Sequence, residues 1–140
     1  MKSKLGSADY VSVRGDVLDL PALVGIIKQY DIDTVLHTAA IIAGRVAVEG
    51  YWAFNVNIQG TINVAEATRL AGVTRIVHVS TLGVYNRALE GSTPVAETLE
   101  RGDSSAYGNS KAVQELVLEA YRGVVGFELM MVRLAHVFGL

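Results

Sequence analysis

Tyr107 and Lys111 have the types and the spacing of an acid–base pair. They are four residues apart near the start of an expected helix, so their side chains share one face of it. A phenol with its ordinary pKa of about 10 is a poor acid or base at neutral pH, and a nearby ammonium brings that pKa down. Lysine also has three N–H donors that can hold a ribose hydroxyl. The alternative is an ordinary amphipathic helix, because Tyr-x-x-x-Lys also arises by chance.

Thr81 adds a hydroxyl to this pair. It directly follows an apolar strand, at the point where the chain leaves the predicted sheet. A donor at that point can bind a substrate oxygen opposite the tyrosine and stabilise negative charge that develops there. The alternative is a threonine in a turn, which is common.

Apolar strands alternate with amphipathic helices along the chain. Strands are predicted at 11–13, 34–37, 75–79 and 127–134, and helices at 20–30, 51–70 and from Ser104 or Ser105 to about 121. Asp19 can cap the first helix and Gly72 can end the second. Helical crossovers join parallel strands, so this β-α-β-α-β-α-β order predicts an α/β fold with a doubly wound parallel sheet.

In such sheets, ligands bind beyond the carboxyl ends of the strands. Polar or small residues follow each of the predicted strands: Asp16, Thr38-Ala39-Ala40, Ser80-Thr81 and Ala135-His136. Because the ends of parallel strands meet at one edge, these residues predict a single ligand crevice there.

Composition narrows the class of protein. The chain has 140 residues, 51% hydrophobic and 19% charged, which fits one domain whose strands are buried on both faces. Its net charge of −2 predicts no nucleic-acid partner, and the lack of an apolar run of ~20 residues predicts no membrane span. The sequence has no cysteine, so disulfides and thiolate metal sites are excluded and a cytoplasmic location is favoured. No group of His, Asp and Glu has metal-ligand spacing.

Six segments carry a family resemblance, in order and at sensible spacing. They lie at 14–17, 35–40, 55–61, 77–85, 107–111 and 132–139. Together they resemble the extended short-chain dehydrogenases/reductases, the NAD-dependent epimerase/dehydratase family, which includes sugar-nucleotide epimerases. The resemblance covers residues 10 to 140 and implies a Rossmann-like dinucleotide-binding domain.

The resemblance also implies an activity. A family member is an oxidoreductase or isomerase that transfers a hydride at a carbinol or carbonyl carbon of a small-molecule substrate, such as a sugar nucleotide. Tyr107 would be the acid/base, Lys111 would lower the pKa of Tyr107 and hold the nicotinamide ribose, and Thr81 would bind the substrate oxygen. The implied cofactor is NAD, with NADP not excluded, and its expected contacts are Asp16, Val17, Thr38, Ala39, Ala40, Asn57, Tyr107, Lys111 and Ala135. Helices 52–70 and 106–121 would pair two copies into a homodimer.

The sequence departs from the family pattern in one large respect. It has no Gly-x-x-Gly-x-x-Gly turn to cradle the diphosphate, and it stops before the family's C-terminal substrate region. We therefore expect residues 1–140 to be a partial dinucleotide-binding domain with an incomplete sheet. The rival interpretation is a catalytically inactive fragment or a degenerate dinucleotide-fold module kept for binding.

Smaller departures concern the subtype. Nucleotide-sugar 4,6-dehydratases have an acidic pair after the threonine, where this chain has Leu82 and Gly83, so 4,6-dehydration is disfavoured. His136 stands where many members have asparagine. His37 and His78 lie within apolar strands, so we expect them to be core residues with satisfied hydrogen bonds.

Overall fold

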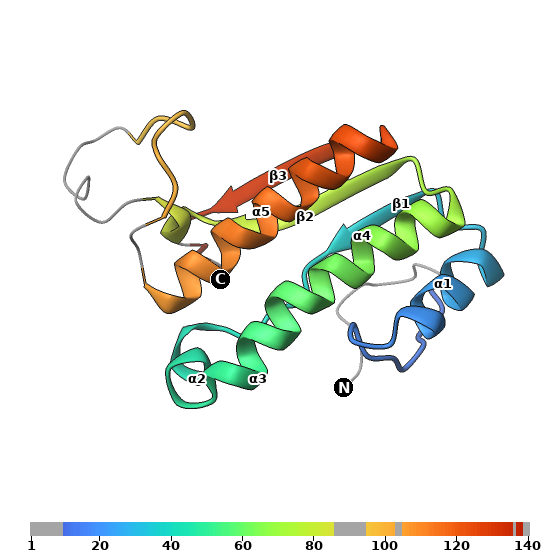
Figure 1. Ribbon diagram of the computed structural model, residues 1–140, viewed down its shortest axis with the longest axis horizontal. Coiled ribbons are helices and arrows are strands. Elements are labelled where there is room, and N and C mark those ends of the chain that lie inside the picture. The colour runs from blue at the N-terminus through green and yellow to red at the C-terminus, as the bar shows by residue number, and fades with distance from the viewer. Residues whose placement is uncertain (1–9, 86–94, 103–104, 136, 139–140) are drawn as a thin grey trace.

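A parallel sheet of three strands, in the order β1-β2-β3, forms one layer of the computed structural model (Figure 1). The strands are β1 (Thr34–His37), β2 (Arg75–Thr81) and β3 (Glu128–Leu134). The structure describes residues 10–85, 95–102, 105–135 and 137–138. Val35, Ile76 and Leu129 lie side by side across the strands, which confirms the predicted parallel α/β sheet for these three segments.

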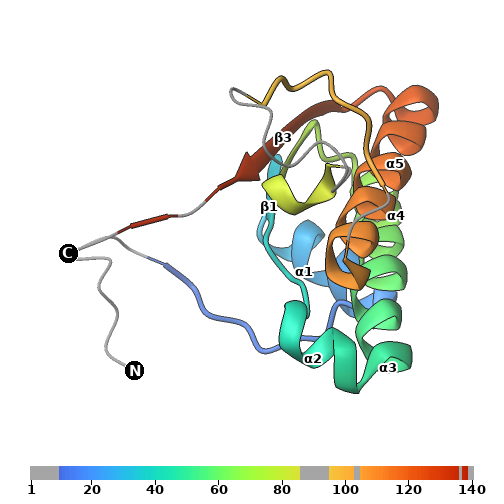
Figure 2. The same cartoon turned by 90° about the vertical axis from the view of Figure 1, so that its left-hand side faces the viewer.

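Two long helices form the crossovers and cover one face of the sheet (Figure 2). They are α4 (Gly60–Ala71), which leads from β1 to β2, and α5 (Ala106–Val125), which leads from β2 to β3. The core between this face and the helices includes Ala65, Ile76, Leu118 and Phe127. Burying an aliphatic side chain of this size is worth ~1.5–3 kcal/mol, so this cluster fixes the helices on the sheet.

Short sequence signals set the helix ends. The Asp19 carboxylate accepts from the Ala22 N–H at 3.0 Å and caps α1 (Leu20–Gln29). Ser105 caps α5 in the same way, by accepting from the Gly108 N–H at 3.0 Å. Gly72 ends α4 with a positive φ of 75°, which glycine adopts at little cost. These boundaries agree with the sequence predictions, except that α5 continues past 121.

The predicted helix over 51–70 is present but has three parts. These are α3 (Gly50–Phe54), a π-helical turn η1 (Asn55–Gln59) and α4. In the wider turn the Asn57 carbonyl accepts from two side chains, Thr61 Oγ1 at 2.7 Å and Gln114 Nε2 at 2.6 Å. A short helix that the sequence did not predict, α2 (Ala43–Val48), precedes it.

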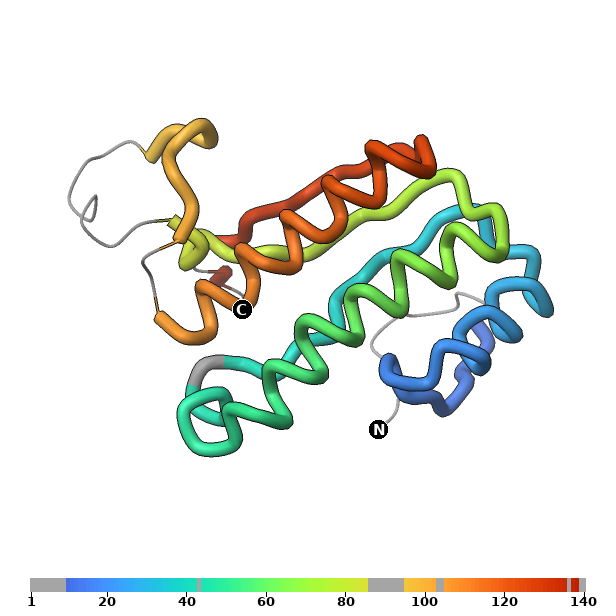
Figure 3. The backbone as a smooth tube through the Cα atoms, viewed as in Figure 1, coloured from blue at the N-terminus to red at the C-terminus, as the bar shows by residue number. Residues whose placement is uncertain are grey.

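The strand predicted at 11–13 is not formed. Residues 10–16 have no strand pairing within the described part of the chain, and Val11 is 66% exposed. Figure 3 shows this stretch, in dark blue, running apart from the three strands. A strand is stabilised by its neighbours more than by its own propensity, and no described strand lies beside this one.

The two faces of the sheet differ. On β2 the buried side chains Ile76, His78 and Ser80 alternate with partly exposed ones, so they point towards the helices. Residues of the other face stay open to solvent, as Leu36 at 63% and Met130 at 54% exposure show.

Two small turns complete the described structure. A 3-10 turn, η2 (Leu82–Val84), follows β2, and Tyr85 then makes an isolated antiparallel bridge with Arg101. No helix or strand forms over 95–102, as predicted for the polar loop there, whose other residues lie outside the described ranges.

Candidate functional site

Three of the expected site segments lie at one edge of the sheet. Thr38, Thr81 and Ala135 follow or end β1, β2 and β3, which are neighbours with parallel direction. The convergence of strand ends predicted from the sequence is thus present for these three, and His136 lies outside the described residues.

The fourth segment, at Asp16 and Val17, follows no strand. The Asp16 carboxylate accepts from the Leu18 N–H at 2.9 Å, and Asn63 Nδ2 donates to the Val17 carbonyl at 3.0 Å. Val17 also lies against Gly60, where an added Cβ would come within 2.7 Å of Val17 Cγ2. The segment is therefore held by α4 and not by a neighbouring strand.

Lys111 is buried in the first part of α5, with 2% of its surface exposed. Its Nζ donates to the Val79 carbonyl of β2 at 2.8 Å. Burial lowers its pKa to about 8, and the Glu115 carboxylate opposes that shift. An ammonium with this environment is placed at the carboxyl end of β2 and can change its charge near neutral pH.

Tyr107 lies one turn before Lys111 and is half-buried. Burial raises the pKa of its phenol. The Lys111 ammonium faces the Val79 carbonyl. The acid–base role of the pair therefore remains a prediction.

The Thr81 hydroxyl caps the turn that follows β2. Its Oγ1 accepts from the Gly83 N–H at 3.2 Å. Strand alternation places this side chain on the face opposite the one that α5 covers, at the end of the strand. No hydrogen bond joins its hydroxyl to that of Tyr107, so a substrate that contacts both would have to lie across the strand end.

Asn57 is fully buried, and its side-chain amide bonds residues of two other segments. Its Oδ1 accepts from the Ile41 N–H at 2.7 Å, and its Nδ2 donates to the Ile41 carbonyl at 3.1 Å and to Ser110 Oγ at 3.0 Å. Ser110 Oγ in turn donates to the Tyr107 carbonyl at 2.7 Å. Asn57 thus links the turn after β1, which contains Thr38 to Ala40, to the helical turn that contains Tyr107.

The two strand histidines are core residues, as expected, but only one is satisfied. His37 Nε2 lies 3.0 Å from Thr61 Oγ1, and it must be the donor because Thr61 gives its one hydrogen to the Asn57 carbonyl. Both ring nitrogens of His78 lack a hydrogen-bond partner within the described structure. Burial, with the nearby Lys111 charge, lowers the pKa of His37 to about 4 and that of His78 to about 3.

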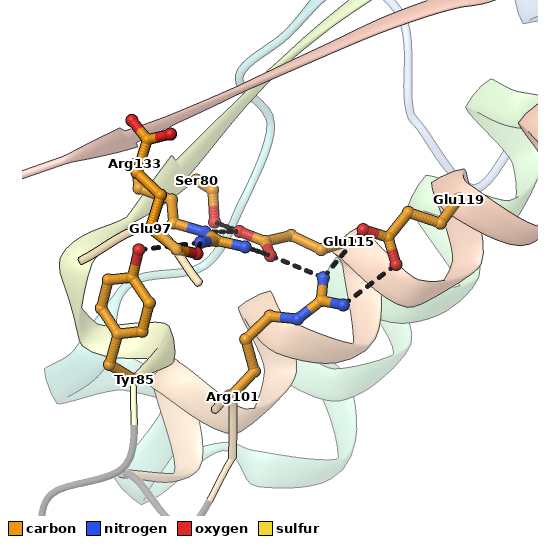
Figure 4. A network of polar contacts seen from close by, with 7 residues as sticks. All are labelled: Ser80, Tyr85, Glu97, Arg101, Glu115, Glu119 and Arg133. Atoms are coloured by element: carbon orange, nitrogen blue, oxygen red, sulfur yellow. Dashed lines mark hydrogen bonds and ion pairs between the residues drawn. The ribbon is translucent and has the colours of Figure 1, made fainter. Parts of the chain in front are cut away.

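The sequence prediction missed a buried charge network centred on Glu115 (Figure 4). This carboxylate, with none of its surface exposed, accepts from Ser80, Arg101 and Arg133. Two signals were available in the sequence: Glu115 continues the four-residue spacing of Tyr107 and Lys111, and Arg133 is a charge inside an apolar strand.

The described ranges hold no group of three or more His, Cys, Asp or Glu side chains that could bind a metal ion. Their helices also include none with the length and apolar character of a membrane span.

These residues fit part of a nicotinamide dinucleotide. Lys111 Nζ has three N–H donors and one acceptor in the described structure, Val79 O, so it can also hold a ribose hydroxyl at the edge where the strands end. The sequence lacks the glycine turn that would approach the diphosphate. The fit therefore covers the nicotinamide end of the cofactor.

A parallel sheet in which Thr81 ends β2, followed by a helix with Tyr107 and a buried Lys111, agrees with the resemblance to short-chain dehydrogenases/reductases drawn from the sequence. The chain belongs to the NAD dependent epimerase/dehydratase family, which matches residues 2–140. This confirms the family resemblance drawn from the six segments.

Individual relatives agree with that assignment. The chain is 30% identical to UDP-glucose 4-epimerase of Mycolicibacterium smegmatis, over 99% of its own length and 44% of the relative's. It is 28% identical to dTDP-glucose 4,6-dehydratase of Xanthomonas campestris, over 96% and 41% of the two lengths. A crystal structure of UDP-glucose-4-epimerase from Stenotrophomonas maltophila, with bound NAD and formylated UDP-arabinopyranose, superposes with a TM-score of 0.79 at 31% identity, over 86% of this chain and 36% of that one. The chain thus spans less than half the length of these proteins.

Proposed function

We propose that this chain carries the catalytic residues of an NAD-dependent enzyme that transfers a hydride at a carbinol or carbonyl carbon of a sugar nucleotide. The supporting observation is the buried Lys111, whose ammonium reaches the end of β2 one turn after Tyr107. Burying a cation costs free energy, so a buried lysine calls for a functional reason. A lysine next to a tyrosine at the carboxyl edge of the sheet supplies one, because the proposed reaction needs a tyrosine whose proton can be exchanged.

In the proposed reaction Tyr107 moves the proton and the substrate carbon loses the hydride. As the substrate alcohol is oxidised, its O–H proton passes to the phenolate of Tyr107 and its C–H hydride leaves; reduction reverses both transfers. Thr81 would donate to the same substrate oxygen, and Lys111 would stabilise the phenolate and hold a ribose hydroxyl. NAD, when bound, supplies the hydride acceptor and donor.

The remaining expected contacts would hold the rest of the cofactor, partly at the ends of β1 and β3 and partly at the segment of Asp16, which follows no strand. Asp16, with Val17 beside it, would accept from the adenine amino group, and the backbone of Thr38 to Ala40 would pass close to the ribose and diphosphate. Asn57 would act through the Ile41 backbone that it bonds. Ala135 would line the nicotinamide. We favour NAD over NADP because the matched relative of known structure has NAD bound.

Within the family, we propose an epimerase or a dehydrogenase/reductase. The chain resembles both an epimerase and a 4,6-dehydratase. Leu82 and Gly83, however, cannot transfer the extra proton that elimination of water needs, because neither side chain has an ionisable group.

The proposal is tested by Tyr107→Phe in the native protein that carries this chain. Turnover of a UDP-sugar should fall by ~10²–10⁴-fold while NAD affinity stays nearly unchanged, because the phenol proton is used in the reaction and the ring only packs. Lys111→Ala should reduce both turnover and NAD affinity. Steady-state kinetics and calorimetric titration with NAD measure the two effects, and a Tyr107→Phe variant that keeps more than ~10% of turnover would contradict the assignment.

A binding module, in which the dinucleotide fold is kept for binding without catalysis, is the rival function. It predicts that the wild-type protein turns over no UDP-sugar, and that Tyr107→Phe therefore has no activity to remove. Turnover by the wild-type protein therefore separates the two functions.

We also propose that the protein is cytoplasmic and that it forms a homodimer. The dimer would form through the outer faces of α4 and α5. Leu116 is 52% exposed on α5, and a groove of about 310 Å³ between the helices is lined by Glu66, Arg69, Ala120, Tyr121, Val124 and Val125. Light scattering tests the assembly, and a clean monomer at high concentration would exclude it.

A further inference from the structure

We propose that Glu115 is a positioning residue for the candidate active site. Its buried carboxylate, on α5, is bonded to the end of β2, to the end of β3 and to the loop that precedes α5. The inference rests on the proposed function of Tyr107, Lys111 and Thr81. It concerns a residue that touches none of the expected reacting atoms.

The contacts of Glu115 reach three parts of the chain (Figure 4). Ser80 Oγ on β2 donates to its Oε1 at 2.5 Å. Arg133 on β3 donates to both oxygens, through Nε at 3.0 Å and Nη2 at 2.8 Å. Arg101, in the loop before α5, donates to Oε2 at 2.9 Å. One carboxylate therefore fixes the distances between these elements.

The arginines extend this link to the segment after Thr81. Arg133 Nη1 donates to the Tyr85 hydroxyl at 2.8 Å and to the Glu97 carbonyl at 2.9 Å. Arg101 also pairs with Glu119 at 3.0 Å. The loop that leaves the end of β2 is thereby tied back to the helix that bears Tyr107.

Glu115 and Lys111 hold consecutive residues of β2. Lys111 Nζ bonds the Val79 carbonyl, and Glu115 bonds the Ser80 side chain, immediately before Thr81. Tyr107, Lys111 and Glu115 are spaced by four residues and form one stripe along α5. A shift of α5 along the strand would thus move Tyr107 and Lys111 together relative to Thr81.

Stability alone does not account for such a group. Replacing a buried ion pair by well-packed apolar side chains is often neutral or stabilising, so a fully buried carboxylate between two guanidinium groups is not the simplest core. Directional bonds to a sheet end and to a helix fix geometry in a way that apolar contacts do not. The charge also supports the Lys111 ammonium, since Glu115 raises the pKa that burial lowers.

The experiment compares Glu115→Gln with Glu119→Gln as the matched control. Both variants remove a carboxylate from Arg101, but only Glu115 touches Ser80 and Arg133. In the 140-residue chain with ¹³C-labelled lysine, NMR titration should show a lower pKa for Lys111 in Glu115→Gln and no change in Glu119→Gln. This readout needs no turnover, so it stays informative if the proposed enzyme activity is wrong.

In the native protein, kcat with a UDP-sugar should fall by ~10–10²-fold in Glu115→Gln with little change in KM, as expected for misplaced reacting groups. The alkaline limb of the kcat profile should move to lower pH, which a purely structural role would not cause. If Glu115→Gln does not fold, Ser80→Ala removes the bond to β2 while leaving the ion pairs, and it should reduce kcat in the same direction. The proposal would be overturned if Glu115→Gln and Glu119→Gln had the same Lys111 pKa and the same kcat. It would also be overturned if Ser80→Ala kept full kcat.

Discussion

The covered face of the three-stranded sheet holds buried polar groups beside its apolar core, whereas the open face holds exposed aliphatic side chains. The face under α4 and α5 contains His37, His78 and Ser80, all at or below 4% exposure, and the Glu115 carboxylate lies against it. The open face carries Leu36 and other aliphatic side chains that remain in contact with solvent; these include Met130, Val132 and Leu134.

The difference separates two roles within one sheet. Polar groups on the covered face cost free energy unless they are bonded. The Glu115 network bonds Ser80 at the end of β2 and so reaches the candidate site, whereas the His78 ring has no partner in the described structure. Parallel strands are normally covered on both faces, and the apolar open face has the composition of a covered one. Its apolar composition predicts self-association through this face.

The largest effect should come from breaking the charge network of the covered face. Glu115→Leu leaves Arg101 and Arg133 without their shared carboxylate, and removing one partner of a buried pair costs ~3–5 kcal/mol of unfolding free energy. Urea denaturation measures this loss. Leu134→Ala on the open face is the comparison and should cost less than ~1 kcal/mol, because that side chain is already 41% exposed. Similar losses for the two variants would remove the contrast between the faces.

An intermediate effect should appear in the dependence of stability on pH. His37 and His78 have folded pKa values of about 4 and about 3, below the ordinary 6.5, so the unfolded state binds more protons between these values. Stability is therefore complete above pH 6.5 and is lost as the pH falls towards the folded pKa. Each group contributes up to ~1.4 kcal/mol per pH unit in this window.

His78→Leu sharpens this test. The ring nitrogens of His78 have no partner in the described structure, so the change should cost little at pH 7 and should reduce the loss between pH 6.5 and 5 by ~2 kcal/mol. Thermal unfolding across this pH range measures it. An unchanged pH slope would show that His78 is not buried as a neutral ring.

The smallest effect on unfolding should come from Met130→Lys on the open face. Its side chain is 54% exposed, so the unfolding free energy should change by no more than ~0.5 kcal/mol. Self-association of the chain should nevertheless decrease, because a charge interrupts the apolar surface. Dynamic light scattering against concentration tests this, with Glu128→Lys as a control at the end of the same strand. Equal association of the two variants and the wild type would show that the open face does not mediate contact.

The comparison also explains what the sequence predicted well. Strands β1, β2 and β3 and helices α1 and α5 follow from apolar runs and caps such as Asp19 and Ser105, because those signals are local. The segment at Val11 has the same local signal but no strand, since pairing depends on a neighbour. Local patterns also do not show that Glu115 meets Arg133, because that contact joins residues brought together only by the crossover.

For the candidate site, the sequence predicted which residues take part and at which edge of the sheet they lie, but not the hydrogen bonds that they make. Thr81 and Lys111 lie at the predicted end of β2. The partners of Asn57 lie in a turn and in a helix that are distant in sequence, so its bonds to Ile41 and Ser110 required the structure. The sequence could not predict that the His78 ring lacks hydrogen bonds, because that depends on which side chains surround the ring in the folded protein.

Because of the π-helical turn η1, the arrangement of this site depends on the exact number of residues between α3 and α4. Such a turn accommodates one residue more than an α-helix of the same rise, and residues advance by about 100° each around the axis. Deletion of one residue within 55–59 would give an uninterrupted helix with better backbone bonding, yet it would rotate everything before the turn relative to α4. The side-chain amide of Asn57 would then no longer bond both the Ile41 backbone and Ser110. A single-codon deletion here would therefore change the arrangement of the site without adding any unfavourable residue.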